Sequence, residues 1–260
     1  MSPLVPPMDD LDLCWRAEEA CLNAWPAVRT VMLGGWLLRL SDGPTRRTDS
    51  VNPRRGSPPD PTPIFQEATA LFAERGRSVL FRIPSMASEA DKALTQLGFS
   101  PPEAETCTLF APALTGVHEG AVDVVLSEAP SDDWQAARAH LTEADAVASR
   151  AYARMLGLIV GPRCFAATHQ DGRVAAIAYG VVSRGLLVIE SVATDPALRR
   201  SGLGRKTVGA LLQWGASQGV SQACLQVVAA NAPARALYQS LGFSRELYRY
   251  HYRRGPTWVG

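Results

Sequence analysis

The sequence predicts an α/β fold in which a mixed, mostly antiparallel sheet is flanked by helices, and it predicts that this unit occurs twice. Three observations support this prediction. Short apolar and β-branched segments alternate with segments whose apolar residues follow helical spacing. Within residues 188–212, a strand passes through an Arg- and Gly-containing loop directly into a helix. Landmarks of the second half also recur in the first half at an offset of 143 or 144 residues.

The composition is that of a globular protein with no strong electric field of its own. The 260 residues are 47% hydrophobic, which suits one large or two ordinary domains. With 26 basic and 25 acidic side chains the net charge is +1, so we expect no nucleic-acid partner. The sequence contains no signal peptide and no apolar run of about 18 residues, and we therefore expect a cytoplasmic protein with no membrane partner.

Cysteines and histidines give no sign of a metal centre or of a disulfide framework. The five cysteines are scattered and form no C-x-x-C pair, and the four histidines lack ligand spacing. The sequence also lacks the G-x-S-x-G turn of many serine hydrolases. We therefore expect no bound metal, and we expect the cysteines to lie in the core.

The second half of the chain is expected to order its elements so that they build one sheet. A polar turn at Ser131 can cap a first helix. Two tight turns, at residues 170–172 and 183–185, join three strands into an antiparallel meander. Gly219 ends the helix that follows the Arg/Gly loop. The expected helices are 134–141, 144–156 and 232–240, and the expected strands are 164–168, 174–182, 186–193, 223–228 and 247–253.

The first half repeats part of this order. Helices are expected over residues 65–74 and 89–96, with a strand over 79–83 between them. The tripeptide Leu-Gly-Phe at residues 97–99 matches the same tripeptide at 241–243, and Gly76 matches Gly219. We therefore predict a duplicated fold, divided into residues 1–115 and 116–260, with a chance match as the alternative.

The Arg/Gly loop has the features of an anion-binding site. The first turn of a helix presents unpaired N–H groups, and the helix dipole favours negative charge there. Gly202 and Gly204 have no Cβ, so a bulky diphosphate can approach the main chain closely. Arg199, Arg200 and Arg205 add positive charge. A glycine-containing surface turn is the alternative interpretation.

The spacing Arg199-x-x-Gly202-x-Gly204 resembles the acetyl-CoA loop of the GNAT superfamily of N-acetyltransferases, and residues 225–243 resemble its second signature. The resemblance covers most of residues 122–254 and implies two tandem GNAT-like domains, of which the second binds the cofactor. The implied function is transfer of the acetyl group of acetyl-CoA to a primary amine of a small molecule, an amino acid or a peptide N-terminus, by direct attack in a ternary complex. The alternative is a non-catalytic acyl-CoA-binding sensor or regulatory module, and the oligomeric state stays open.

The resemblance also implies roles for particular residues. Tyr238 is placed to protonate the departing thiolate, unless it only packs, and the N–H of Val192 or Ala193 lies near the developing oxyanion. Asn231 is expected to cap a helix and to lie near the pantetheine. The residues implied to bind the cofactor are Val192, Ala193, Thr194, Arg199, Arg200, Ser201, Gly202, Leu203, Gly204, Arg205, Asn231 and Ala234.

Glu190 is the candidate base, because a carboxylate within an apolar strand is costly unless it is paired or used. The alternative is a partnered structural charge. Many members of the superfamily carry a carboxylate on the next strand, where this chain has Gln226. Ordered water and an acid from the first half therefore compete with Glu190 for the role of base.

The first half lacks this chemistry. Residues 49–56 contain no second glycine and lead into no immediate helix, so we expect no cofactor loop there. Ala87 and Leu94 stand where the second half has Asn231 and Tyr238. One tryptophan and three arginines either line a substrate cleft or occupy an ordinary strand and turn: Trp36, Arg39, Arg46 and Arg47.

Overall fold

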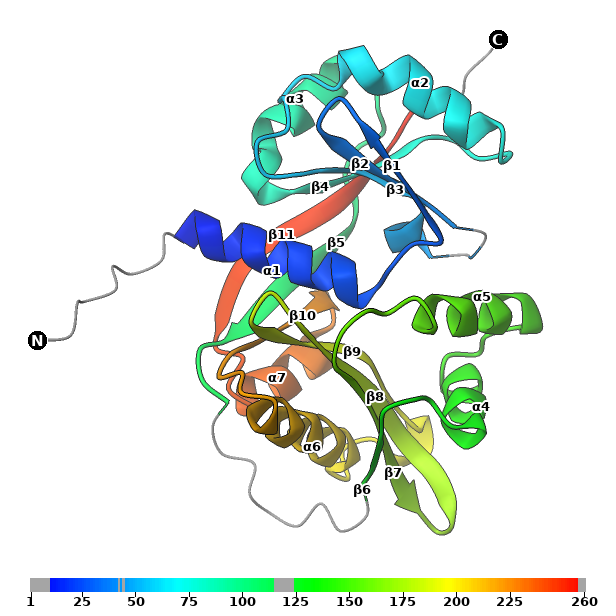
Figure 1. Cartoon of the computed structure of the whole chain (residues 1–260), viewed down its shortest axis with the longest axis vertical. Coiled ribbons are helices and arrows are strands. Elements are labelled where there is room, and N and C mark those ends of the chain that lie inside the picture. The colour runs from blue at the N-terminus through cyan, green and yellow to red at the C-terminus, as the bar shows by residue number, and fades with distance from the viewer. Residues whose placement is uncertain (1–9, 42, 44, 115–123, 257–260) are drawn as a thin grey trace, which may run out of the picture.

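The computed structural model describes residues 10–41, 43, 45–114 and 124–256, and these residues form one continuous sheet with helices on both faces (Figure 1). The strand order is β1-β2-β3-β4-β11-β5-β10-β9-β8-β7-β6. The strands are β1 (Arg29–Leu33), β2 (Trp36–Leu40), β3 (Ser50–Pro53), β4 (Leu80–Pro84), β5 (Glu103–Ala111), β6 (Val124–Ser127), β7 (Arg163–Gln170), β8 (Arg173–Ser183), β9 (Leu186–Thr194), β10 (Ala223–Val228) and β11 (Arg245–Arg254).

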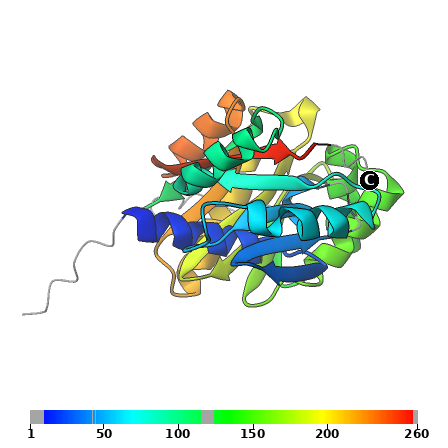
Figure 2. The same cartoon turned by 90° about the horizontal axis from the view of Figure 1, so that it is seen from above.

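Three hydrophobic clusters hold the helices on the sheet. One cluster packs α1, α4 and α5 on one face, and a second packs α6 and α7 on the opposite face. Seen from above, α1 and α7 accordingly lie on opposite sides of the strands (Figure 2). The third cluster packs α2 and α3 on β1–β4. The helices are α1 (Asp10–Ala24), α2 (Thr62–Ala73), α3 (Ser88–Gln96), α4 (Asp132–Leu141), α5 (Ala146–Leu156), α6 (Leu203–Ser217) and α7 (Ala232–Ser240), with short 3-10 turns η1 (Arg46–Thr48), η2 (Ser85–Ala87) and η3 (Pro196–Leu198).

The predicted meander of the second half is confirmed as β7, β8 and β9, which pair antiparallel. Each of its two turns has a positive φ at both central residues, at Asp171 and Gly172 (52° and 75°) and at Arg184 and Gly185 (54° and 72°). This is the pattern of two-residue hairpins whose twist matches the strands. The two turns that the sequence predicted, each from a glycine that follows a polar residue, are therefore confirmed.

The duplication is visible in individual hydrogen bonds. The N–H of Phe99 donates to the carbonyl of Leu94, and the N–H of Phe243 donates to that of Tyr238, both at 3.1 Å. Each half also places one parallel strand after its antiparallel strands, because β3 pairs parallel with β4 and β9 pairs parallel with β10. The repeat that the two Leu-Gly-Phe tripeptides predicted is therefore a repeat of structure.

The two halves exchange their last strands. β5 comes from the first half of the sequence but pairs antiparallel with β10, and β11 comes from the second half but pairs antiparallel with β4. β5 and β11 also pair with each other, so the sheet continues across the middle of the molecule. The predicted boundary between residues 115 and 116 lies outside the described residues, and the division into two domains stays a prediction.

A buried ion pair ties α1 to this exchanged region. Glu18 of α1 contacts Arg82 of β4 through both carboxylate oxygens, with 3.0 Å between Nη2 and Oε2, and both side chains are 1% exposed. Two tyrosines of β11 complete the cluster: Tyr248 donates to Glu18 at 2.6 Å, and the Arg82 guanidinium lies 3.6 Å from the Tyr250 ring centre. Burial raises the pKa of Glu18, but Arg82 outweighs burial and holds the pKa below its ordinary value. Glu18 is therefore ionised at neutral pH.

We predict that Glu18→Ala lowers the free energy of unfolding by about 3–5 kcal/mol, because it leaves Arg82 buried without its counter-ion. Urea denaturation at neutral pH measures the loss. Since the folded pKa of Glu18 is lowered, its contribution to stability is complete at neutral pH and is lost as the pH falls through that lowered value.

The matched control for this prediction is the neighbouring residue Glu19. Its ion pair with Arg184 has an N–O distance of 2.9 Å and is about half exposed on both sides. Glu19→Ala should cost less than about 1 kcal/mol. Equal losses for the two variants would contradict the role assigned to the buried pair.

Candidate functional site

The sheet opens where β9 leaves β10. Their parallel pairing ends at Ile189 and Leu225. Directly afterwards β9 bulges, because Ser191 and Val192 together lie opposite Ala178 of β8, and Ser191 has a φ of 53°. A bulge of this kind bends its strand away from the regular ladder. Within the described part of the chain, the main chain of β9 beyond Ile189 therefore has no strand partner on the β10 side.

Helix α6 begins beside this open edge with an uncapped amide end. Gly202 is its N-cap residue, has a φ of 85° and offers no side chain to the first turn. The amides of Leu203, Gly204 and Arg205 consequently lack both an intrahelical partner and a cap. A Cβ on Gly204 would lie 3.2 Å from Oγ1 of Thr194, so the helix start lies directly against the end of β9.

The three arginines of the loop differ in their contacts. Arg199 and Arg200 are exposed and form no ion pair with any described residue. Arg205 instead donates to the hydroxyl of Ser240 in α7 at 2.8 Å. The residues predicted to bind an anion thus come together at the start of α6, with two of the three guanidinium groups free to meet it.

Helix α7 brings the predicted acid to the same opening. The Asn231 side chain caps this helix by accepting from the N–H of Ala234 at 3.1 Å, as expected from the sequence. Tyr238 is 7% exposed, and its hydroxyl has no hydrogen-bond partner among the described residues. Burial and the negative charge of Glu190 raise the pKa of Tyr238. The phenol therefore keeps its proton at neutral pH.

Glu190 is held by an arginine from the first half. Its carboxylate is 4% exposed and accepts two hydrogen bonds from Arg47, at 2.8 and 2.9 Å. The same guanidinium lies 3.9 Å from the ring centre of Trp25 and 3.4 Å from Oε1 of Gln226. Burial lowers the pKa of Arg47, but Glu190 outweighs burial and raises it above its ordinary value. The partnered charge that was the alternative interpretation of Glu190 is therefore present, and its role as a base stays a prediction.

A second buried arginine fixes this arrangement. Arg39 of β2 is 3% exposed and donates to the carbonyl oxygens of Trp25, Leu22 and Arg47. Burial and the neighbouring cations lower the pKa of Arg39 to about 9. Its three acceptors join the end of α1 to the turn that carries Arg47, so Arg39 holds the main chain of that turn against α1.

Sequence reasoning left the first-half arginines open between two interpretations. Trp36 is fully buried and packs in the core of the first half, and Arg46 lies on the surface beside Glu103. Arg47, in contrast, reaches Glu190 across the junction of the halves. An available signal was Arg39, a charged residue inside an apolar strand, which requires buried acceptors nearby.

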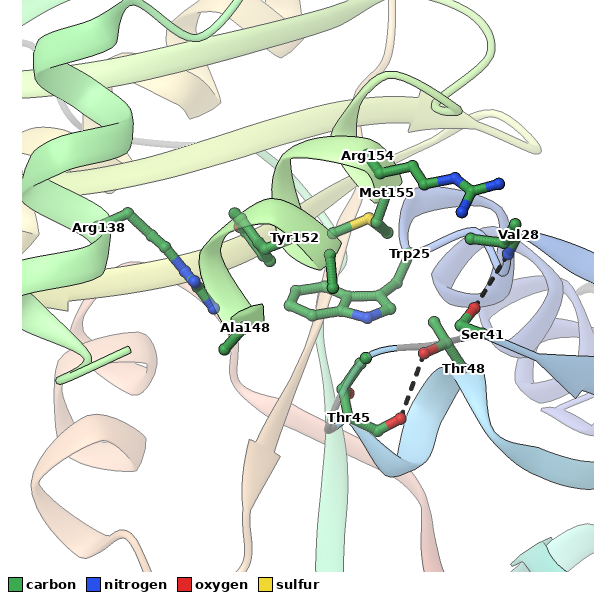
Figure 3. Close-up of a pocket in the computed structure, with 12 residues that line it drawn as sticks. Trp25, Val28, Ser41, Thr45, Thr48, Arg138, Ala148, Tyr152, Arg154 and Met155 are labelled. Atoms are coloured by element: carbon green, nitrogen blue, oxygen red, sulfur yellow. Dashed lines mark hydrogen bonds between the residues drawn. The ribbon is translucent and has the colours of Figure 1, made fainter. Parts of the chain in front are cut away.

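A cavity of about 90 Å³ lies between the halves, next to the bulge (Figure 3). Its wall on the second-half side includes Tyr152, whose hydroxyl lies 2.5 Å from Oγ of Ser191. The Arg138 guanidinium lies 3.7 Å from the ring centre of Tyr152. The described residues that line the cavity are Trp25, Val28, Ser41, Gly43, Thr45, Thr48, Arg138, Ala148, Ala151, Tyr152, Arg154 and Met155.

Two further properties of the described residues bear on the site. They contain no group of three or more His, Cys, Asp and Glu side chains arranged to hold a metal ion. Among the helices they form, none has the length and apolar character needed to cross a lipid bilayer.

The sequence matches the family described as "Probable histone acetyltransferase Rv0428c C-terminal" over residues 15–253. It is 24% identical over 253 residues to the uncharacterised N-acetyltransferase YobR of Bacillus subtilis (strain 168), covering 95% of this chain and 99% of that protein. It is also 39% identical over 83 residues to the ribosomal protein bS18-alanine N-acetyltransferase of Escherichia coli (strain K12). That match covers 32% of this chain and 56% of the enzyme, so the chain spans about half the length of this relative.

Two solved structures share the whole architecture. A GCN5-related N-acetyltransferase from Kribbella flavida superimposes with a TM-score of 0.69 at 17% identity, covering 95% of this chain and 96% of that one. A tandem GNAT protein from the clavulanic acid biosynthesis pathway superimposes with a TM-score of 0.64 at 15% identity, covering 95% and 94%. The chain belongs to the family of the probable histone acetyltransferase Rv0428c C-terminal region, and its fold is the tandem form of the GNAT N-acetyltransferase fold.

Proposed function

We propose that the protein transfers the acetyl group of acetyl-CoA to a primary amine, with the second half binding the cofactor and the first half completing the acceptor side. One observation carries this proposal: the unpaired edge of β9 ends at the uncapped start of α6. These are the two main-chain surfaces that an extended cofactor with a diphosphate needs, and they meet at one opening.

The chain's residues suit each part of acetyl-CoA. The amides of Leu203, Gly204 and Arg205 would hold the diphosphate, with Arg199 and Arg200 adding charge. The main chain of Val192, Ala193 and Thr194 would pair with the pantetheine arm like an added strand, and Asn231 and Ala234 at the start of α7 would border it. When bound, acetyl-CoA supplies a thioester whose carbonyl carbon is open to attack by an amine.

Tyr238 is the proposed proton donor to the departing thiolate. Its hydroxyl makes no hydrogen bond within the described part of the chain, so it is available to the sulfur. The raised pKa of Tyr238 keeps the proton in place, and burial would also raise the pKa of a thiol held beside it. The two groups are thus matched as donor and acceptor.

Glu190 is the proposed proton acceptor for the amine. An incoming ammonium is itself a cation and can replace one of the two hydrogen bonds that Arg47 makes to this carboxylate. Arg47 would keep the second bond and so hold the carboxylate in place. In this scheme the first half positions the base, although the base belongs to the second half.

The contact between Arg47 and Glu190 also favours a second candidate function. If the pair never opens, no carboxylate is available at the opening, because the next strand carries Gln226. The protein would then be an acyl-CoA-binding regulatory module. Tight acetyl-CoA binding without thiol release for any amine would favour this candidate over the enzyme.

We predict that Gly202→Asp weakens acetyl-CoA binding by at least about 100-fold, roughly 2.7 kcal/mol, because it puts a carboxylate where the diphosphate binds. Gly219→Asp is the matched control, since Gly219 lies at the other end of α6, has a similar φ of 81° and, like Gly202, leaves room for a Cβ. Calorimetric titration with acetyl-CoA compares the variants. Equal affinities would refute the assignment of the loop.

Tyr238→Phe should lower kcat on the order of 10²-fold while leaving acetyl-CoA affinity nearly unchanged, because it removes a proton donor and not a binding surface. In the unaltered protein the raised pKa predicts no loss of rate from this phenol below about pH 10. Tyr252→Phe, at a buried tyrosine of the sheet, is the control. A Tyr238→Phe rate equal to that of the control would remove the hydroxyl from the mechanism.

Glu190→Gln should lower kcat by about 10²–10⁴-fold, because the amide cannot accept a proton. Steady-state rates measured across the pH range provide the test. A kcat close to that of the unaltered protein would assign Glu190 to pairing with Arg47 and move the base to ordered water.

A further inference from the structure

The cavity between the halves has two buried hydrogen-bond donors without an acceptor. Nη1 of Arg138 and Nε1 of Trp25 are inaccessible to solvent, and neither donates to any described residue. Figure 3 shows that the two donors do not face each other: Arg138 approaches Tyr152 and the indole from one side, while Thr45 and Thr48 lie on the other. Buried donors are nearly always satisfied in proteins. Both side chains would have to turn toward the cavity for an acceptor there to reach these two donors.

Arg138 also forms no ion pair with any of the acidic residues that the structure describes. It comes from α4, is half-buried and stacks 3.7 Å from the ring centre of Tyr152. Burial lowers its pKa, and the groups that counteract burial are Tyr152 and Tyr179, neither of which is a carboxylate. No Asp or Glu occurs among the described residues of the cavity wall. An anion that entered would pair with a guanidinium that no described carboxylate neutralises.

Two other arginines near the cavity, Arg47 and Arg39, are already matched, and Arg154 adds a second guanidinium to the wall. Arg47 lies over the ring of Trp25, but its guanidinium already forms an ion pair with Glu190. Arg39, behind the same tryptophan, donates to three main-chain carbonyls. The remaining positive charge therefore makes the cavity favourable for an anion and unfavourable for a second cation at the Arg138 end.

Tyr152 connects the wall of the cavity to the proposed reacting centre. Tyr152 forms the link, because its ring stacks with Arg138 and its hydroxyl contacts Ser191 at the bulge of β9. Its apolar wall includes Val28, Ala151 and Met155, and its volume of about 90 Å³ suits a small molecule or a single side chain. No residue of β9 or α7 is among the described residues that line the cavity, so a ligand held by Arg138 would have to pass Tyr152 to reach the bulge.

We propose that the acetyl acceptor is a small amine that carries a carboxylate, with the carboxylate paired to Arg138 and the amine directed to the bulge at Ser191. This inference rests on the proposed acetyl transfer for the role of the amine, whereas the carboxylate site stands on the cavity itself. The first half contributes Trp25 and the threonines of the opposite wall. A lysine-rich peptide would bring cations toward an unpaired guanidinium, and it is the acceptor class that this site disfavours.

Binding tests the carboxylate site independently of catalysis. Calorimetry on the full chain saturated with CoA compares matched pairs: leucine with leucinamide, and 4-aminobutanoate with 4-aminobutanamide. At least one acid should bind ten or more times as tightly as its amide, the range expected for a hydrogen bond to a charged group. Arg138→Gln should abolish this preference and Arg138→Lys should restore part of it. Arg150→Gln, at an exposed arginine of α5, should leave the preference unchanged.

Equal affinities within both pairs, no heat with any of the four compounds, or a preference that survives Arg138→Gln would each overturn the carboxylate site. Thiol release from acetyl-CoA with the same compounds then separates the two proposals. Faster turnover of the amides than of the acids would refute the carboxylate site and leave acetyl transfer intact. An acid preference in binding without turnover of any compound would refute acetyl transfer and leave the site intact.

Discussion

The site depends on the separation of β9 from β10 after Ile189. Parallel strands normally satisfy each other's main-chain groups, so a strand that leaves its partner exposes donors and acceptors that need a substitute. The bulge at Ser191 forces this separation, and the uncapped end of α6 lies where the freed strand ends. The bulge also lets the two faces of the sheet meet at one opening, since Glu190 faces the α1 side while Tyr238 comes from α7 on the other side. The proposed acid and base can therefore approach one thioester from opposite faces.

In the proposed function the first half, where the sequence predicts no cofactor loop, shapes the acceptor side of the site. Strand exchange through β5 and β11 fuses the halves into one sheet, and the Glu18–Arg82 pair locks α1 onto that junction. From there, Gln226 donates to the hydroxyl of Tyr248, which in turn donates to Glu18. Since Gln226 also accepts from Arg47, a continuous chain of polar contacts links the junction to the proposed base. The first half therefore contributes to the position of the proposed base, although the cofactor would bind to the second half.

The sequence predicted those features that are encoded by local patterns. Helical spacing, turn glycines and the Arg199-x-x-Gly202-x-Gly204 loop identified the second-half elements and the uncapped helix, and Asn231 was correctly expected to cap α7. The exchange of β5 and β11 could not be predicted, because local propensity does not record which strand a segment pairs with. The contact of Arg47 with Glu190 joins residues far apart in the sequence, so it became visible only in the folded chain. For the same reason the sequence could not show that Arg138 forms no ion pair with a described residue.

Hydrogen–deuterium exchange, with and without acetyl-CoA, tests most directly whether the freed edge of β9 and the start of α6 hold the cofactor. Amides at residues 192–194 and 203–205 should exchange more slowly when acetyl-CoA is present, because the cofactor would become their missing partner. Residues 49–56, the equivalent segment of the first half, should exchange at an unchanged rate. Unaltered exchange at 192–205 in saturating acetyl-CoA, or protection that appears at 49–56 instead, would contradict the account.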